Sequence, residues 1–304
     1  MVSLKKFKKI LILSGGISEE RDISQSSANH VYETIKNEAT TKILDVSYNA
    51  DQLLTNIQKF SPDVIFNCLH GYFGEDGQIQ SILNYLKIPY THSGVLTSAI
   101  LMNKVISKKL FKSLGIRSPE FLSEYNIYNK KLKFPLIIKP VNGGSSYGLI
   151  KVNNKKSLSE YLNKKKIKKS KMLIEEFIFG RELTVGILEN KICGVMEIKF
   201  SEELYDYNNK YINIAEHIIS PKLPKRIENE LIENSLKVHS SLSCNCISRL
   251  DFRYNEETNK TYLLEVNTQP GLTKNSLLPE MAREKGISFL KLCEILLKAS
   301  ICEI

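Results

Sequence analysis

The chain has 304 residues, of which 42% are apolar, and a formal net charge of +10. This length is sufficient for two or three domains with ordinary hydrophobic cores. The charge comes mainly from scattered lysines, and the one concentrated basic run, 163–171, contains no arginine or aromatic residue, which favours a solvated connection over a nucleic-acid surface. No run of 18 apolar residues is present, the apolar N-terminal run is too short for a signal peptide, and the six cysteines lack metal or CxxC spacing. We therefore expect a soluble cytoplasmic protein that binds neither nucleic acid nor membrane, with a charge that suits anionic ligands such as nucleotides.

The first 95 or so residues alternate between strand and helix patterns. Strands are expected at 10–13, 43–46 and 63–69, and helices at 18–36, 51–60 and 78–86, with Ser18 as the first N-cap. This alternation predicts a parallel, doubly wound α/β domain over residues 1–97. Its ligand crevice should lie beyond the carboxyl ends of the strands. Glu20 and His70 follow such strand ends, although a lone histidine is more often a structural hydrogen-bonding residue than a catalyst.

Two α+β domains are expected after residue 97. The first, 98–180, should contain a helix at 97–114, strands at 135–139, 149–152 and 172–178, and a short helix at 157–162. The second, 181–304, should contain a hairpin around Glu189-Asn190, a helix at 227–242, two strands with acidic ends and a helix at 289–299.

A glycine-rich stretch, 143–148, lies between two of these strands and indicates a hairpin loop. Its backbone N–H groups, with the hydroxyls of Ser145 and Ser146, are suited to binding phosphate. Lys139 ends the preceding strand and Lys104 lies on the preceding helix, so a phosphate clamp is plausible. A plain turn is the alternative, since this stretch is neither a Walker A motif nor a strand–helix GxGxxG.

A carboxylate interrupts the apolar run 173–178. Burying Glu175 there is costly unless it is paired or accepts hydrogen bonds. The amino group of an adenine is one partner, with the backbone of Glu176 and Ile178 reading the ring edge. The alternative is an edge-strand residue that faces water.

The acidic strands near the C-terminus offer a metal site. Glu265 and Asn267 share one face of a short strand because side chains alternate with period 2, and Arg249 and Asp251 form a second such pair. Oxygen ligands of this kind suit Mg²⁺ with nucleotide phosphates. Ordinary salt bridging at a strand end remains the alternative.

Taken in order, these motifs resemble the D-alanine–D-alanine ligase family of the ATP-grasp superfamily along nearly the whole chain. The motifs that carry the resemblance are Gly15-Gly16-x-Ser18-x-Glu20-Arg21, Leu69-His70-Gly71, Gly74-Glu75-Asp76-Gly77, Met102-Asn103-Lys104, Ile138-Lys139-Pro140, Gly144-Ser145-Ser146, Ile174-Glu175-Glu176, Tyr205-Asp206-Tyr207-x-x-Lys210-Tyr211, Arg249-x-Asp251 and Glu265-Val-Asn267-Thr-x-Pro270-Gly271.

The resemblance implies an ATP-grasp fold of mixed α/β and α+β class, in which an N-terminal parallel doubly wound domain precedes two α+β domains that sandwich ATP. It implies two steps for peptidoglycan precursor synthesis: ATP phosphorylates the carboxylate of one D-alanine, and the amine of a second D-alanine attacks the acyl phosphate. Two Mg²⁺ ions per site, with Mn²⁺ as an alternative ion, and a homodimer are implied as well.

The resemblance also implies the roles of individual residues. Nucleotide binding would fall to Lys104, Lys139, Ser146, Glu175, Glu176, Ile178, Glu182 and Lys210, with Glu175 reading adenine, Glu182 the ribose and the lysines the phosphates. Metal binding would fall to Asp251, Glu265 and Asn267. Catalysis would fall to Glu20, Ser145, Tyr211, Arg249 and Gly271, and contacts with D-alanine to Glu20, His70, Ser276 and Leu277.

The sequence departs from the family pattern at Asn103, Gly143, Tyr147 and Glu176, and none of these departures removes an implied ligand. Three alternatives remain open. The first is a ligase that joins D-alanine to D-lactate or D-serine, against which Tyr211 argues. The second is an ATP-grasp ligase for another carboxylate, such as a carboxylase. The third is a nucleotide-binding module with a disabled site, which the presence of every metal ligand argues against.

Overall fold

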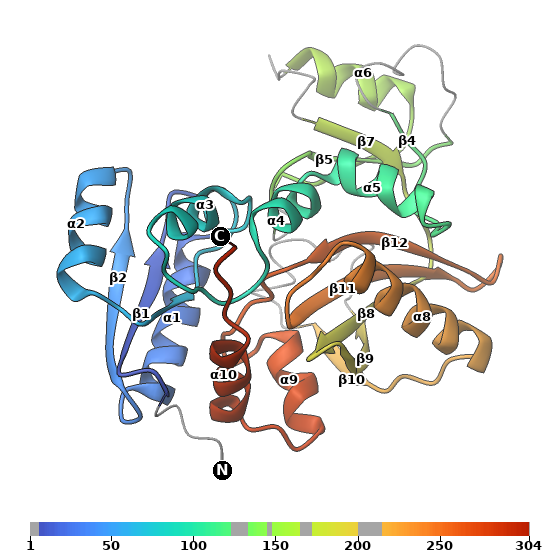
Figure 1. Ribbon diagram of the computed structural model, residues 1–304. Coiled ribbons are helices and arrows are strands. Elements are labelled where there is room, and N and C mark those ends of the chain that lie inside the picture. The colour runs from blue at the N-terminus through green and yellow to red at the C-terminus, as the bar shows by residue number, and fades with distance from the viewer. Residues whose placement is uncertain (1–5, 123–132, 145–147, 165–171, 200–214, 304) are drawn as a thin grey trace.

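The computed structural model describes residues 6–122, 133–144, 148–164, 172–199 and 215–303 (Figure 1). Its strands form three sheets: a three-stranded one near the N-terminus, a four-stranded one in the middle of the chain and a five-stranded one toward the C-terminus. None of the helices within these ranges is long and apolar enough to span a membrane. Ser145, Ser146, Lys210 and Tyr211 lie outside the described residues.

The N-terminal sheet is parallel, with strand order β2-β1-β3, as the alternating pattern predicts. Its elements are β1 (Lys9–Gly15), α1 (Arg21–Ile35), β2 (Thr40–Val46), α2 (Ala50–Phe60), β3 (Val64–Asn67) and α3 (Gln78–Tyr85). Alternate residues of β1 are buried on opposite faces: Ile10 and Ile12 pack with α1, whereas Leu11 and Leu13 pack with α2 and α3. Helices on both faces explain why β1 reads as a continuous apolar run.

The other two sheets are antiparallel. The central one has the order β4-β7-β5-β6 and the C-terminal one the order β10-β9-β8-β11-β12. The strands are β4 (Phe121–Leu122), β5 (Leu136–Pro140), β6 (Ile150–Val152), β7 (Met172–Glu176), β8 (Arg181–Leu188), β9 (Lys191–Lys199), β10 (Glu216–Ile219), β11 (Ile247–Asn255) and β12 (Lys260–Asn267). The helices are α4 (Val95–Met102), α5 (Lys104–Ser113), α6 (Lys155–Lys164), α8 (Lys225–Ser241), α9 (Leu277–Glu284) and α10 (Phe289–Lys298). This mixture of one parallel and two antiparallel sheets is the expected α/β and α+β class.

The prediction of one helix over 97–114 is wrong, because the chain forms two helices that meet at Asn103. The backbone of Asn103 is extended (φ −87°, ψ 100°), and its side-chain oxygen accepts hydrogen bonds from the N–H groups of Val105 and Ile106. Asparagine is a strong N-cap, so the residue that ends α4 also starts α5. Lys104 is therefore the first residue of α5 and not part of a helix interior.

The expected N-cap of the first helix is also wrong by two residues. Glu20 occupies the N-cap position of α1, and its side chain makes no capping hydrogen bond. The hydroxyl of Ser18 instead accepts a hydrogen bond from the Glu20 N–H and donates one to the carbonyl oxygen of His70. Ser18 thus ties the loop after β1 to the loop after β3.

Hydrophobic packing joins the two ends of the chain. One core cluster combines Ile10, Ile12 and residues of α1 with Leu278, Leu292 and other residues of α9 and α10. Figure 1 shows α9 and α10 between the N-terminal sheet and the C-terminal one. Beyond α10, Ile301 pairs with Tyr90, which in turn bridges β3. The last described residues therefore extend the N-terminal sheet.

Candidate active site

The two acidic strands lie side by side, as their sequence pattern indicates. In the antiparallel pair β11–β12, Arg249 is opposite Asn267 and Asp251 is opposite Glu265. Four polar side chains are thereby gathered at one end of the C-terminal sheet. Directly opposed residues of neighbouring strands are close enough to share one ligand.

Asp251 accepts three hydrogen bonds in this structure. Its Oδ1 accepts from Arg249 Nε (2.9 Å) and Thr184 Oγ1 (2.6 Å), and its Oδ2 accepts from an Arg249 terminal nitrogen (2.7 Å). The Arg249–Asp251 pair is nearly buried, and such charge-assisted, two-point pairs are among the stronger protein hydrogen bonds. The Glu265 carboxylate also has a cation nearby, with its Oε2 3.5 Å from Lys104 Nζ. Among the described residues, no three His, Cys, Asp or Glu side chains converge as a complete metal site.

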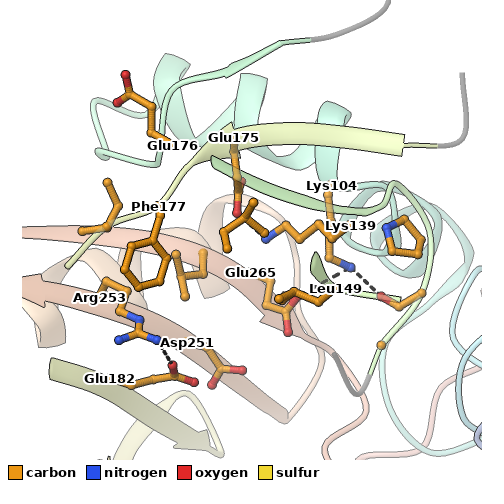
Figure 2. Close-up of a pocket in the computed structure, with 16 residues that line it drawn as sticks. Lys104, Lys139, Leu149, Glu175, Glu176, Phe177, Glu182, Asp251, Arg253 and Glu265 are labelled. Carbon is orange, nitrogen blue, oxygen red and sulfur yellow. Dashed lines mark hydrogen bonds and ion pairs between the residues drawn. The ribbon is translucent and has the colours of Figure 1, made fainter. Parts of the chain in front are cut away.

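A pocket lies between the central and C-terminal sheets (Figure 2). Lys104, Lys139 and Glu175 line it from the central sheet and α5, while Glu182 and Asp251 line it from the C-terminal sheet. Lys104 also donates a hydrogen bond to the carbonyl oxygen of Gly143, which anchors the start of the glycine-rich hairpin. The pocket has a volume of about 90 Å³.

Glu175 is buried between two lysines, so the alternative of an edge residue facing water is wrong. β7 lies between β4 and β5, and Glu175 is 3% exposed. Its Oε1 is 2.6 Å from Lys139 Nζ, and its Oε2 is 2.9 Å from Lys108 Nζ. The second contact is an ion pair whose angles do not meet those of a hydrogen bond. Whether this carboxylate reads adenine stays a prediction.

The charges of this cluster shift one another's titration. Burial acts to raise the pKa of Glu175, but the ammonium groups of Lys108 and Lys139 outweigh it, so the pKa falls below its usual value. Burial acts to lower the pKa of Lys139, and the charges of Glu175 and Glu265 outweigh it, so that pKa rises. Burial lowers the pKa of Lys108 to about 8, because Glu175 compensates only part of the cost. Sequence reasoning missed Lys108.

Three further residues implied by the resemblance lie at the pocket. Glu182 forms an ion pair with Arg253 (2.8 Å), directly opposite it on β11. Ile178 lines the pocket just past β7. The Glu176 side chain points away from the pocket in Figure 2, so this residue faces it through its backbone.

A larger cleft of about 1190 Å³ adjoins this pocket and contains Glu20, His70, Arg249 and Ser276. Glu20 is buried, and a Cβ placed on Gly144 would lie 2.8 Å from its Oε2. The glycine-rich hairpin therefore passes directly against a carboxylate 124 positions earlier in the chain. This contact brings the N-terminal and central parts of the chain to one site.

His70 has a hydrogen-bond partner at each ring nitrogen, and whether it also contacts substrate stays a prediction. Its Nδ1 lies 2.9 Å from Glu75 Oε1 and its Nε2 lies 3.4 Å from Ser27 Oγ. Burial acts to lower the pKa of His70, but the hydrogen bond and charge of Glu75 outweigh it and raise the pKa above 6.5.

The loop after β12 borders the same cleft. Gly271, Ser276 and Leu277 line it, and Ser276 is the N-cap residue of α9. A helix N-terminus favours anions such as a carboxylate. Gln269, which sequence reasoning missed, fixes this loop: it accepts from Asn67 Nδ2 (2.9 Å) and donates to the carbonyl oxygen of Leu69.

Comparison with known proteins identifies the family. The sequence model described as "D-ala D-ala ligase C-terminus" matches residues 112–298, more than half of the chain, and that described as "D-ala D-ala ligase N-terminus" matches residues 45–93. The chain belongs to the D-alanine–D-alanine ligase family.

Curated relatives and solved structures agree with this assignment. A D-alanine–D-alanine ligase of Pelagibacter ubique is 46% identical, with 96% of this chain and 97% of the relative covered. One of Wolbachia pipientis wMel is 40% identical over 96% of this chain and 94% of the relative. A Bacillus anthracis D-alanine–D-alanine ligase in complex with ATP has a TM-score of 0.79 at 29% identity, covering 96% of this chain and 97% of that one. The VanG D-Ala:D-Ser ligase of Enterococcus faecalis has a TM-score of 0.78 at 27% identity, covering 96% and 99%.

Proposed function

We propose that this ligase uses ATP to join two molecules of D-alanine into D-alanyl-D-alanine, a precursor of peptidoglycan. The observation that carries the proposal is that the pocket and the larger cleft adjoin each other. Glu20, the Gly144 backbone and the Arg249–Asp251 and Glu265–Asn267 pairs lie around them. The pocket offers lysines and oxygen ligands for a nucleotide, and the larger cleft offers a carboxylate and a helix N-terminus for an amino acid. The family membership and the ATP complex of the Bacillus anthracis relative support the same assignment.

We place the nucleotide between the central and C-terminal sheets. Lys104, Lys139 and the hairpin at Gly143 are positioned to bind phosphates, and Glu175, Ile178 and Glu182 to bind the adenosine part. Ser146 and Lys210, outside the described residues, are proposed as phosphate ligands on the resemblance.

The residues at the β11–β12 end fit two Mg²⁺ ions, or Mn²⁺ in their place. Asp251 and Glu265 offer carboxylate oxygens and Asn267 an amide oxygen, which alone are too few for Mg²⁺, an ion that usually combines one or two carboxylates with substrate phosphates. Metal bound with ATP would supply charge stabilisation at the transferring phosphoryl group. Oδ2 of Asp251 accepts one hydrogen bond from Arg249, so a second lone pair of this oxygen would serve as a metal ligand.

The chemistry follows from the groups around the larger cleft. Glu20 would bind the ammonium group of the first D-alanine. A carboxylate oxygen of this D-alanine would then attack the γ-phosphorus of ATP, and ADP would leave. The second D-alanine would place its carboxylate at Ser276 and Leu277, and its amine would attack the acyl phosphate, expelling phosphate. Arg249 would stabilise the tetrahedral oxyanion together with the Gly271 N–H. Ser145 and Tyr211, outside the described residues, are proposed to hydrogen-bond with Glu20.

The VanG structure keeps D-serine open as the second substrate, because its fold is equally similar. Phosphate release should be measured with ATP and Mg²⁺ against D-alanine, L-alanine, D-serine and D-lactate. We expect D-alanine alone to support full turnover at neutral pH and EDTA to abolish it. Equal release with D-lactate, or release without any D-amino acid, would contradict the proposed function.

The remaining parts of the proposal concern organisation. We propose three domains, 1–97, 98–180 and 181–304, and a cytoplasmic homodimer. Size-exclusion chromatography with light scattering tests the homodimer directly.

A further inference from the structure

Lys108 lies behind the wall of the nucleotide pocket and not in it. It is one helical turn after Lys104 on α5, so the two side chains share a face of the helix. Lys104 lines the pocket, whereas the Lys108 side chain has no exposed surface and does not line it. A fully buried lysine is rare unless it is paired. Its described partner is Glu175, at 2.9 Å.

Two lysines share the carboxylate of Glu175, and each faces a different oxygen of it. Glu265 adds a second negative charge near both lysines. One lysine is enough to neutralise Glu175 itself, so the other can interact with a ligand. The adjacent pocket is the one proposed for a polyanion.

The two lysines differ in what they can reach. Lys139 lines the pocket and is 10% exposed at its side chain, but in this structure its ammonium is held 2.6 Å from Glu175. If Lys139 turned to a phosphate without Lys108, a buried carboxylate would remain unpaired, which is strongly unfavourable. With Lys108 in place, Glu175 stays neutralised and its Oε1 becomes available as an acceptor.

We propose that Lys108 is a positioning residue for the nucleotide: it neutralises Glu175 from behind the pocket wall, so that Lys139 can leave this carboxylate for a phosphate oxygen when ATP binds. This inference rests on the proposed nucleotide site and deepens it. Lys108 itself touches neither substrate nor reacting atoms.

The test compares Lys108→Met, which keeps length and removes charge, with Lys109→Met, its exposed neighbour on the same helix. MgATP binding is measured by calorimetry, and thermal unfolding is measured without ligand. For Lys108→Met we expect MgATP Kd to rise at least about tenfold, with an unfolding midpoint no lower than that of the parent, because a fully buried ammonium is removed while Lys139 still neutralises Glu175 in the absence of ligand. Lys109→Met should change neither quantity. A lowered midpoint with unchanged Kd would make Lys108 merely structural and overturn the proposal.

A double-variant cycle tests the route through Glu175. In a Glu175→Gln background no carboxylate needs neutralising, so adding Lys108→Met should change MgATP Kd by less than about twofold. A penalty as large as in the parent would refute this route. Failure of the parent protein to bind MgATP would instead contradict the proposed function, which keeps the two outcomes apart.

A measurement on the unaltered protein guards against variants that do not fold. Lys104 lies on the same face of α5 as Lys108, the other charged groups that face Lys108 are Glu175 on β7, Lys139 on β5 and Glu265 on β12, and α4 contributes none. The pKa of Lys139 is raised and that of Glu175 is lowered, so both move away from the range near pH 8 in which Lys108 loses its proton. MgATP Kd should therefore rise about tenfold between pH 7 and pH 9.5, in the parent and in Lys109→Met. A flat profile would contradict the proposal.

Discussion

Replacing Gln269 by methionine tests whether the loop after β12 is fixed by hydrogen bonds to the N-terminal sheet. Gln269 is 2% exposed, and its amide bonds to Asn67 and to the carbonyl oxygen of Leu69, about 200 positions away. Methionine fills a similar volume but leaves the Leu69 oxygen without this donor. The Asn67 amide keeps a second acceptor, the Gly74 oxygen at 3.1 Å, so its loss is partial.

The Leu69 carbonyl oxygen would lose its hydrogen-bond donor from Gln269, and the Asn67 amide would lose one of its two acceptors. Together these losses predict a decrease of about 3 kcal/mol in the free energy of unfolding. In a chain of this length that corresponds to a fall in Tm of roughly 5 °C. Because Gln269 lies two positions before Gly271, we also expect the KM for D-alanine to rise. Calorimetric unfolding and a phosphate-release assay measure these quantities. Gln58→Met, at an exposed position of α2, is the control.

A decrease in Tm of less than about 1 °C for Gln269→Met, or a decrease for Gln58→Met as large as that for Gln269→Met, would refute the reasoning. Either result would mean that other groups, and not Gln269, hold the loop against the sheet.

Three further predictions concern metal, pH and the backbone. Glu265→Gln should lower turnover by roughly 10²–10³, and titration calorimetry should show weaker Mg²⁺-dependent ADP binding; undiminished turnover would contradict the metal assignment. The pKa of His70 is raised above 6.5, so its ion pair with Glu75 stabilises the folded protein fully below pH 6.5 and loses this contribution as pH rises through the raised pKa. In urea unfolding, Glu75→Gln should therefore lower the free energy of unfolding more at pH 6 than at pH 8.5. An equal decrease at both pH values would be evidence against the charge pair. Gly180→Ala places a Cβ 2.0 Å from a backbone oxygen at a residue with φ +118°, and it should lower the free energy of unfolding by about 2 kcal/mol or more. Gly115→Ala, whose Cβ would have nothing within 4 Å, should lower it less. Equal decreases in thermal unfolding experiments would be evidence against this steric argument.

Local patterns predicted the strands and the placement of their acidic residues well. Period-2 alternation placed Asp251 and Glu265 on single faces of two strands, and antiparallel pairing set them opposite each other. Strand–helix alternation likewise predicted the parallel N-terminal sheet. These features depend on residues close in sequence, which is why the sequence is sufficient to predict them.

Side-chain partners across the fold were not predictable in this way. Lys108 is one of several lysines on an amphipathic helix, and nothing local distinguishes it from exposed Lys109. The burial of Glu175 between two lysines depends on how α5 packs over the central sheet. The break at Asn103 was missed because apolar residues continue with helical spacing on both sides of it.

The packing of α10 and Ile301 against the N-terminal sheet has a consequence for synthesis on the ribosome. β1 and α1 emerge before α9 and α10, yet the apolar face that α9 and α10 cover, and the edge that Ile301 pairs through Tyr90, stay open until the segment 277–301 has been made. The part of the nascent chain that contains β1 and α1 must therefore wait, with an uncovered apolar surface, until α9 and α10 have been translated. Chaperone contact during elongation and slow, length-dependent acquisition of protease resistance are the expected signatures.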